Sequence, residues 1–152
     1  MKRIAMFFFL LLMGCVNPST MLIDRDGRFV RCATTGYGYG VAGAIAVTTA
    51  LQSHNRCVED AKLVGFVPMP RVQLGFEGDT KKIPMPIMQL TDNTKDSGLA
   101  VGDLIMELDD KKIGHVVDVL TVLNTKSVGD NVKVKVQRNN QMFVYSVKVI
   151  ER

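Results

Sequence analysis

The stretch "DSGLAVGDLIMELDDKKI", residues 96–113, carries most of the information about the fold. Its central part, "DLIMEL" at 103–108, predicts a β-strand with Ile105 buried. The pair Asp109-Asp110 that follows predicts a turn, because aspartate tolerates turn conformations. A second short strand is expected directly after this turn.

The residues after this stretch change from a strand pattern to a helix pattern and back. In "HVVDVLTVLNTK", residues 115–126, apolar side chains recur at Val116, Val119, Leu120 and Leu123, the spacing of one helix face. Asp118 lies near the helix start, where the helix dipole favours an acid, and Gly129 is expected to end the helix. "NVKVKVQRNNQMFVYSVKVI", residues 131–150, predicts a hairpin that turns at Asn139-Asn140. Together these elements predict an α+β fold, a small partly open β-barrel capped by helices.

The same residues resemble a known family. The run 96–113 is similar to the "AGL-x-x-GD-x-I-x-x-I-N-G-x-x-I" run of bacterial PDZ domains, as found in HtrA-type periplasmic proteases. "VGDNVKVKVQRNN", residues 128–140, is similar to the "PGD-x-V-x-L-x-V-x-R-x-G" that follows in that family. The matching positions are Ser97-Gly98-Leu99, Gly102-Asp103, Ile105, Leu108 and Ile113. The resemblance covers about residues 70–151, so we assign the PDZ domain to 70–152.

The resemblance implies a peptide-binding groove. PDZ domains bind a peptide as an added strand between one sheet edge and a helix. The loop that holds the peptide carboxylate corresponds to Gln73-Leu74-Gly75-Phe76, and Arg71 before it could add positive charge.

The helix forms the other wall of the expected groove. Aligned on the family, Val116, Leu120 and Leu123 face the groove, whereas Val119 and Val122 face the core. The alternative is that all five residues are core. The expected ligands are protein or peptide C-termini with apolar side chains, whose last residue enters a pocket of Leu74, Phe76 and Leu123.

Catalysis is not expected. The family's Ser-Pro-Ala is replaced here by Asp92-Asn93-Thr94, and its turn Asn-Gly by Asp109-Asp110. The chain has no Gly-x-Ser-x-Gly motif, and neither His54 nor His115 has a candidate nucleophile in a catalytic sequence setting. We therefore expect a binding module with no cofactor.

The N-terminal residues resemble a bacterial lipoprotein signal. Residues 1–15, "MKRIAMFFFLLLMGC", consist of the basic pair Lys2-Arg3, an apolar run and then Gly14-Cys15. This resemblance implies a signal peptide over 1–14 and acylation of Cys15; the alternatives are a plain secretory signal or a short membrane anchor. Val16 is not the aspartate associated with inner-membrane retention, which favours the periplasmic face of the outer membrane in the cell envelope.

Charge and cysteine content agree with export. Loss of Lys2 and Arg3 leaves 17 basic against 15 acidic side chains, without a basic cluster, so nucleic acid is not an expected partner. Cys32 and Cys57 remain as a pair, and a disulfide between them would contribute roughly 3 kcal/mol. The alternative is a metal site that combines His54-x-x-Cys57 with Cys32 and the distant His115.

Between the signal and the PDZ domain, residues 15–69 form a glycine-rich segment. Met21–Ile23 and Phe29–Val30 predict a hairpin around Asp26-Gly27, and a helix is expected to start near Cys57.

"GYGYGVAGAIAV" at 36–47 has the Gly38-x-Gly40-x-x-Gly43 spacing of dinucleotide-binding loops, but Glu59 and Asp60 fall within a helical pattern rather than at a strand end. We therefore expect Gly36, Gly40 and Gly43 to serve close packing. This packing could be against lipid, in a homo-oligomer or on the second domain.

Overall fold

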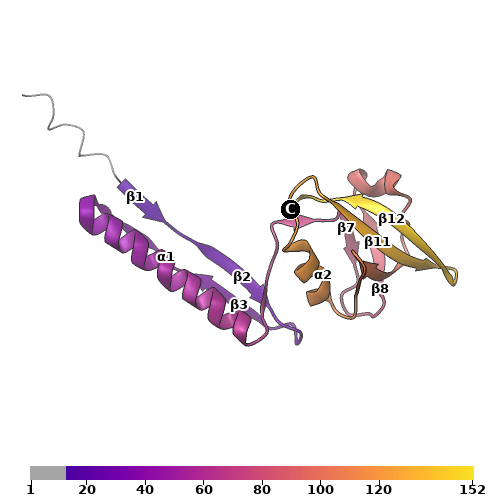
Figure 1. The fold of residues 1–152 in the computed structure, drawn as a ribbon, viewed down its shortest axis with the longest axis horizontal. Coiled ribbons are helices and arrows are strands. Elements are labelled where there is room, and N and C mark those ends of the chain that lie inside the picture. The colour runs from indigo at the N-terminus through magenta and orange to yellow at the C-terminus, as the bar shows by residue number, and fades with distance from the viewer. Residues whose placement is uncertain (1–12) are drawn as a thin grey trace, which may run out of the picture. The chain divides into compact units, whose positions relative to one another are not determined.

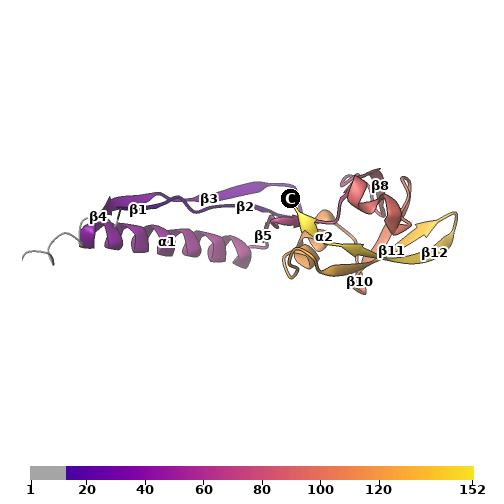
Figure 2. The ribbon, with the colours of Figure 1, turned by 90° about the horizontal axis from the view of Figure 1, so that it is seen from above.

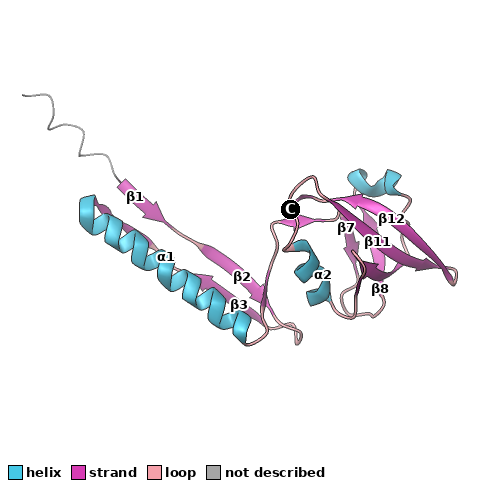
Figure 3. Ribbon diagram, in the orientation of Figure 1, coloured by secondary structure: helices cyan, strands magenta, loops and turns pink. Residues whose placement is uncertain are grey.

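The computed structural model describes residues 13–152, so the basic pair and most of the apolar run of the expected signal peptide lie outside the described residues. The chain divides into two compact units, Met1–Pro68 and Met69–Arg152, shown in Figures 1 and 3. No helix within 13–152 is long and apolar enough to cross a membrane.

The first unit is a layer of short antiparallel strands on one long helix (Figure 2). Its elements are β1 (Met13–Val16), β2 (Ser19–Ile23), β3 (Phe29–Ala33), β4 (Gly36–Tyr39), α1 (Gly40–Leu63) and β5 (Val67–Pro68). β1 pairs with β4, and β2 pairs with both β3 and β5. The predicted hairpin around Asp26-Gly27 is confirmed, since Ile23 pairs with Phe29 across it.

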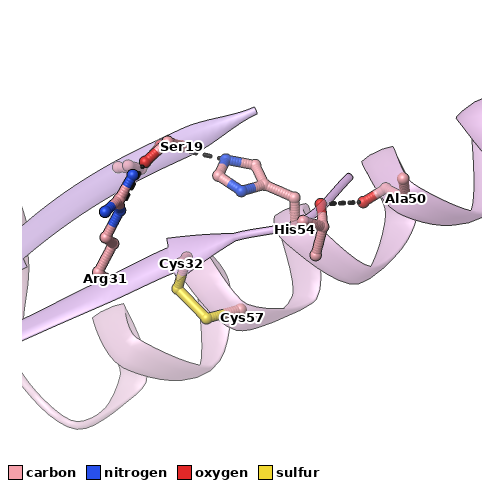
Figure 4. The surroundings of a disulfide bond; sticks show 8 residues. Ser19, Arg31, Cys32, Ala50, His54 and Cys57 are labelled. Atoms are coloured by element: carbon pink, nitrogen blue, oxygen red, sulfur yellow. Dashed lines mark hydrogen bonds between the residues drawn. A yellow bond between two sulfur atoms is a disulfide. The ribbon is translucent and has the colours of Figure 1, made fainter. Parts of the chain in front are cut away.

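The Cys32–Cys57 disulfide is confirmed and joins β3 to α1 (Figure 4). The two Cα atoms are 5.8 Å apart. Both sulfurs are therefore used, which removes the metal site that the His54-x-x-Cys57 spacing suggested. His54 Nε2 instead lies 3.1 Å from Thr20 Oγ1, and the ring is buried between β2 and the helix.

The helix start was predicted wrongly. α1 begins at Gly40, and Cys57 lies in its last third. The β-branched residues of 41–49 have only moderate helix propensity, but packing against the strands outweighs this preference. Gly40 adopts φ +59° at the strand-to-helix junction, with open space where a Cβ would be, so it serves conformation rather than packing.

Gly38 of β4 and Gly43 of α1 bring their backbones into close contact. A Cβ placed on Gly43 would lie 2.3 Å from the carbonyl carbon of Gly38, and one on Gly36 would lie 2.7 Å from the carbonyl oxygen of Ala46. The glycines thus allow β4 to lie directly on the helix. β4 and β5 both pair antiparallel with their neighbours, unlike the parallel strands of a dinucleotide-binding unit.

The second unit contains an open six-stranded sheet with two helices. Its elements are β6 (Val72–Gln73), β7 (Phe76–Gly78), β8 (Met85–Leu90), the 3-10 helix η1 (Asp92–Ser97), β9 (Leu104–Leu108), β10 (Lys111–Lys112), α2 (Val116–Leu123), β11 (Asn131–Arg138), β12 (Gln141–Lys148) and β13 (Ile150–Glu151). The sheet order is β12-β11-β9-β8-β7, with β10 on β9, and a separate pair joins β13 to β6. The predicted α+β fold with a partly open sheet is confirmed.

The alternation read from the sequence of the second unit is also confirmed. Val132, Val134 and Val136 of β11 are fully buried, as is Ile105 of β9. Asp109-Asp110 and Asn139-Asn140 form two-residue turns, and all four residues have positive φ. α2 ends at Leu123, earlier than Gly129, because three turn hydrogen bonds from residues 124–126 close its last carbonyls.

Gly43→Ala provides a test of the close contact in the first unit. Helix propensity alone would make alanine more stable by about 1 kcal/mol. We expect the opposite sign, a loss of about 1–3 kcal/mol, because the new methyl group meets the Gly38 backbone. Urea unfolding followed by far-UV circular dichroism measures the change, and Ala44→Gly at the exposed neighbouring position calibrates propensity in the same helix. A stabilised Gly43→Ala protein would contradict the packing role.

Candidate functional site

The loop Gln73–Phe76 connects β6 to β7 and depends on glycine at position 75. Gly75 has φ +69°, a backbone conformation that side chains disfavour. A Cβ there would also lie 2.8 Å from Thr91 Oγ1 and 2.9 Å from Thr94 Cγ2. Both the conformation and the space therefore require glycine.

The Gly75 carbonyl is held by three donors. It accepts hydrogen bonds from Thr91 N–H at 2.8 Å, from Thr91 Oγ1 at 2.7 Å and from Thr94 Oγ1 at 2.5 Å. Thr94 is only 1% exposed. Because a trans peptide group points its C=O and N–H in opposite directions, this fixation turns the Phe76 N–H away from the threonines. We call these bonds the Gly75 clamp.

β7 is an edge strand of the sheet, and its free side can pair with another strand. Phe76 faces Leu90 of β8, and the Thr91 N–H to Gly75 bond lies next to this pair. In an antiparallel ladder, the N–H and C=O of a residue in this position point to the opposite side. The Phe76 backbone groups thus lie on the open edge, in the geometry needed for strand addition.

The helix residues separate by exposure. Val116 and Leu120 are partly exposed, whereas Val119 and Val122 are 8% and 7% exposed and belong to the core. Leu123 is 6% exposed and shares that core with Leu74. Of the predicted groove residues on α2, Val116 and Leu120 therefore offer accessible side-chain surface, whereas Leu123 is part of the core.

The residues of the pocket predicted for the last ligand side chain also differ in their exposure to solvent. Leu74 is 3% exposed and lies in the core, while Phe76 is partly buried and packs against it. Of the three pocket residues Leu74, Phe76 and Leu123, Phe76 has the largest accessible surface. A ligand side chain would contact Phe76 first.

Arg71 and Gln73 lie beside the C-terminal strand. The Arg71 carbonyl accepts a hydrogen bond from Arg152 N–H at 3.0 Å, and Gln73 Nε2 donates to the Glu151 carbonyl at 3.3 Å. The Gln73 side chain is therefore directed toward β13. Arg71 is exposed, and its charge is available to solvent.

An ion pair that sequence reasoning did not identify fixes the segment before β9. Arg138 Nε and Nη2 donate to the two oxygens of Asp103 at 2.6 and 2.7 Å, and Nη2 also donates to the Gly98 carbonyl at 2.9 Å. Asp103 is 1% exposed and accepts a further bond from Ala100 N–H. The guanidinium carbon lies 5.5 Å from the ring centre of Phe143. The signal was available, since both charges occupy matched positions of the family pattern.

Burial acts to raise the pKa of Asp103, but the Arg138 hydrogen bond, the Ala100 N–H and the Arg138 charge together bring that pKa below its usual value. A lowered pKa means that the folded state favours the charged carboxylate. Its contribution to stability is present above the unfolded pKa and is lost as the pH falls through the folded pKa.

The described residues contain no group of three or more His, Cys, Asp or Glu side chains arranged to hold a metal ion. His115 is the N-cap of α2, where its Nδ1 accepts a hydrogen bond from Val117 N–H at 3.2 Å. Its ring is thus engaged in positioning the helix.

A glycine loop whose carbonyl is fixed inward, an open strand edge and an apolar helix that shares a core with the loop are features of modules that bind a peptide as an added strand. The comparison with protein families agrees, because residues 72–149 match the PDZ domain. The chain belongs to the PDZ domain family. Such a domain is a protein-interaction module without catalytic groups of its own.

Several solved structures are similar to this chain at 11% to 22% sequence identity. A serine endoprotease from Yersinia pestis is 11% identical, with 92% of this chain and 63% of that chain covered and a TM-score of 0.48. The HtrA-type protease AlgW with a tripeptide is 15% identical over 90% of this chain and 45% of that one, at a TM-score of 0.49. An aminopeptidase N family protein from Idiomarina loihiensis is 22% identical, with 54% of this chain and 14% of that chain covered and a TM-score of 0.45.

The chain thus spans 14% to 63% of the length of these proteins. No curated protein sequence matches this chain.

Asp103→Asn tests the ion pair. At neutral pH we expect a loss of about 3 kcal/mol, the lower end of the cost of breaking a buried pair. The difference from the unsubstituted protein should stay constant above pH ~5 and shrink below pH ~4, where the aspartate becomes protonated in the unfolded chain. Urea unfolding across this pH range measures it.

Asp92→Asn is the matched control for that experiment, because Asp92 pairs with Lys95 while 92% exposed. The control should change the free energy of unfolding by less than about 1 kcal/mol. A difference for Asp103→Asn that grows on acidification would contradict the assigned role of the carboxylate.

Thr94→Val tests the Gly75 clamp. Loss of one of the three donors should loosen the loop and weaken binding of a peptide with a free C-terminal carboxylate by roughly 5- to 10-fold, about 1 kcal/mol. The amidated peptide should bind Thr94→Val and the unsubstituted protein equally. Calorimetric titration with each peptide measures the ratio of its affinities for Thr94→Val and for the unsubstituted protein. Thr121→Val, which removes a hydroxyl bonded within α2, is the control. Equal weakening for both peptides would indicate general damage to the groove.

Proposed function

We propose that this protein is a lipid-anchored adaptor of the cell envelope whose PDZ domain captures the C-termini of other proteins by strand addition along β7. The observation that carries the proposal is the Gly75 clamp beside an open edge strand. The clamp orients the Phe76 amide toward the place where a terminal carboxylate would lie, and PDZ domains use such amides for that purpose.

The chemistry of the groove favours apolar ligands. Val116, at the start of α2, is partly exposed and cannot accept a hydrogen bond from a hydroxyl group. A ligand Ser or Thr two residues before its end would leave that hydroxyl unpaired, at a cost of roughly 1–3 kcal/mol. We therefore assign a preference for an apolar ligand residue two positions before the C-terminus, beside Val116, and for an apolar C-terminal residue that contacts Phe76.

The anchor is the second part of the proposal. Cys15 is exposed and unpaired with another cysteine, in agreement with its place after the signal-like residues 1–14. Acylation of Cys15 at the periplasmic face of the outer membrane would keep the groove at the membrane. The mass of the protein extracted from cell envelopes tests this part.

The alternative is a structural lipoprotein that associates with itself through the glycine-rich segment and whose groove does not bind. Of the glycines that suggested it, Gly36 lies against Ala46 and Gly43 against Gly38, both inside the first unit, which favours the adaptor.

A library of peptides with free C-termini tests the groove. We expect selection of apolar residues at the last position and two positions before it, with modest affinity because a flexible peptide is ordered on binding. Leu120→Lys should abolish capture, whereas Val128→Lys, at an exposed position after α2, should not. Selection of Ser or Thr two positions before the end would contradict the role of Val116. Capture unaffected by Leu120→Lys would contradict the groove itself.

A further inference from the structure

The two-stranded sheet of β1 and β4 has two different faces. Cys15 lies opposite Tyr37 in the register, and side chains alternate along each strand, so Cys15, Tyr37 and Tyr39 share one face. Gly36 and Gly38 lie on the other face, against α1. We call the face of Cys15, Tyr37 and Tyr39 the tyrosine face.

The tyrosine face is open to solvent within its unit. Tyr37 is 78% exposed and Tyr39 is 69% exposed. Cys15 is exposed too. Two aromatic side chains with a polar tip, both on one short strand, are characteristic of positions at a membrane–water boundary.

Charge is distributed unevenly along the first unit. No Asp, Glu, Lys or Arg occurs between residues 33 and 55, or between residues 4 and 23. The charged side chains of the described part of this unit lie within 24–31, around the β2–β3 turn, and within 56–62, near the end of α1. The Cys32–Cys57 disulfide connects these two charged stretches, so they lie at the same end (Figure 1). The end that carries β1 and β4 is uncharged.

We propose that the tyrosine face lies in the headgroup region of a lipid bilayer. This inference rests on the proposed acylation of Cys15, which would deliver acyl chains to the same face. Signal cleavage before Cys15 would leave Cys15 and Val16 with their partners Tyr37 and Gly36. The acyl chains enter the bilayer beside Tyr37, and the aromatic side chains add contacts at the level of the headgroups.

A second copy of the chain fits this face less well. β1 and β4 have four residues each. Two such strands cover roughly 14 Å by 10 Å, far below the ~800 Å² per partner of a stable protein interface. A bilayer sets no minimum area, because the acyl chains contribute most of the attachment.

The test uses the absence of tryptophan from the chain. Tyr37→Trp places a single reporter on the tyrosine face, and Phe29→Trp places one at the charged end, where Phe29 is 60% exposed. Both full-length proteins are purified from envelopes and reconstituted into phosphatidylcholine vesicles with and without brominated lipid. We expect blue-shifted emission and loss of most of the fluorescence of Tyr37→Trp on bromination, with neither change for Phe29→Trp.

The possible results separate the two proposals. If the mass shows no lipid on Cys15, the anchor fails and this inference fails with it. If Cys15 is acylated and the protein floats with vesicles, but bromination leaves Tyr37→Trp as bright as Phe29→Trp, the anchor stands and this inference is overturned. A blue shift of Tyr37→Trp that depends on protein concentration in detergent, without quenching by brominated lipid, assigns the face to a second copy and also overturns it.

Discussion

The peptide group between Gly75 and Phe76 has one permitted orientation, because three hydrogen bonds from Thr91 and Thr94 hold its carbonyl. The positive φ of Gly75 makes this orientation accessible, and the threonine contacts leave no room for a side chain. Binding of a carboxylate at the open edge of β7 would depend on this orientation of the peptide group. A rotated peptide group would present its oxygen, instead of its N–H, to an incoming carboxylate. The core beneath, with Leu74 and Leu123, keeps the strand and the helix at a fixed separation.

The sequence predicted the second unit well because its signals are local. The alternation Val132, Val134 and Val136, the helix stripe and the Asn139-Asn140 turn each arise within a few residues. The Asp103–Arg138 pair was missed because its members are 35 residues apart, and the family pattern that matches both positions does not by itself show that they meet. The Gly75 clamp was missed for a similar reason, since neither threonine is distinctive until η1 folds beside the loop.

In the first unit the sequence was less informative. Val41, Ile45 and Val47 favour strands about as much as helices, and the N-cap residue Tyr39 provides no side-chain hydrogen bond to mark the helix start. The helix forms because Gly38 and Gly43 permit contact between β4 and α1, a tertiary effect that local patterns do not reveal. The disulfide could be predicted because it required only a count of the cysteines and the expectation of an oxidising compartment.

All three cysteines of the sequence lie before residue 69, in the first unit. The stability of the two units therefore responds differently to reducing agents. Reduction of Cys32–Cys57 removes a cross-link worth roughly 3 kcal/mol from the first unit, whereas the second unit contains no thiol that could be reduced or oxidised to a disulfide. The fold of the second unit therefore contains no bond whose formation depends on redox conditions, whereas the first unit does.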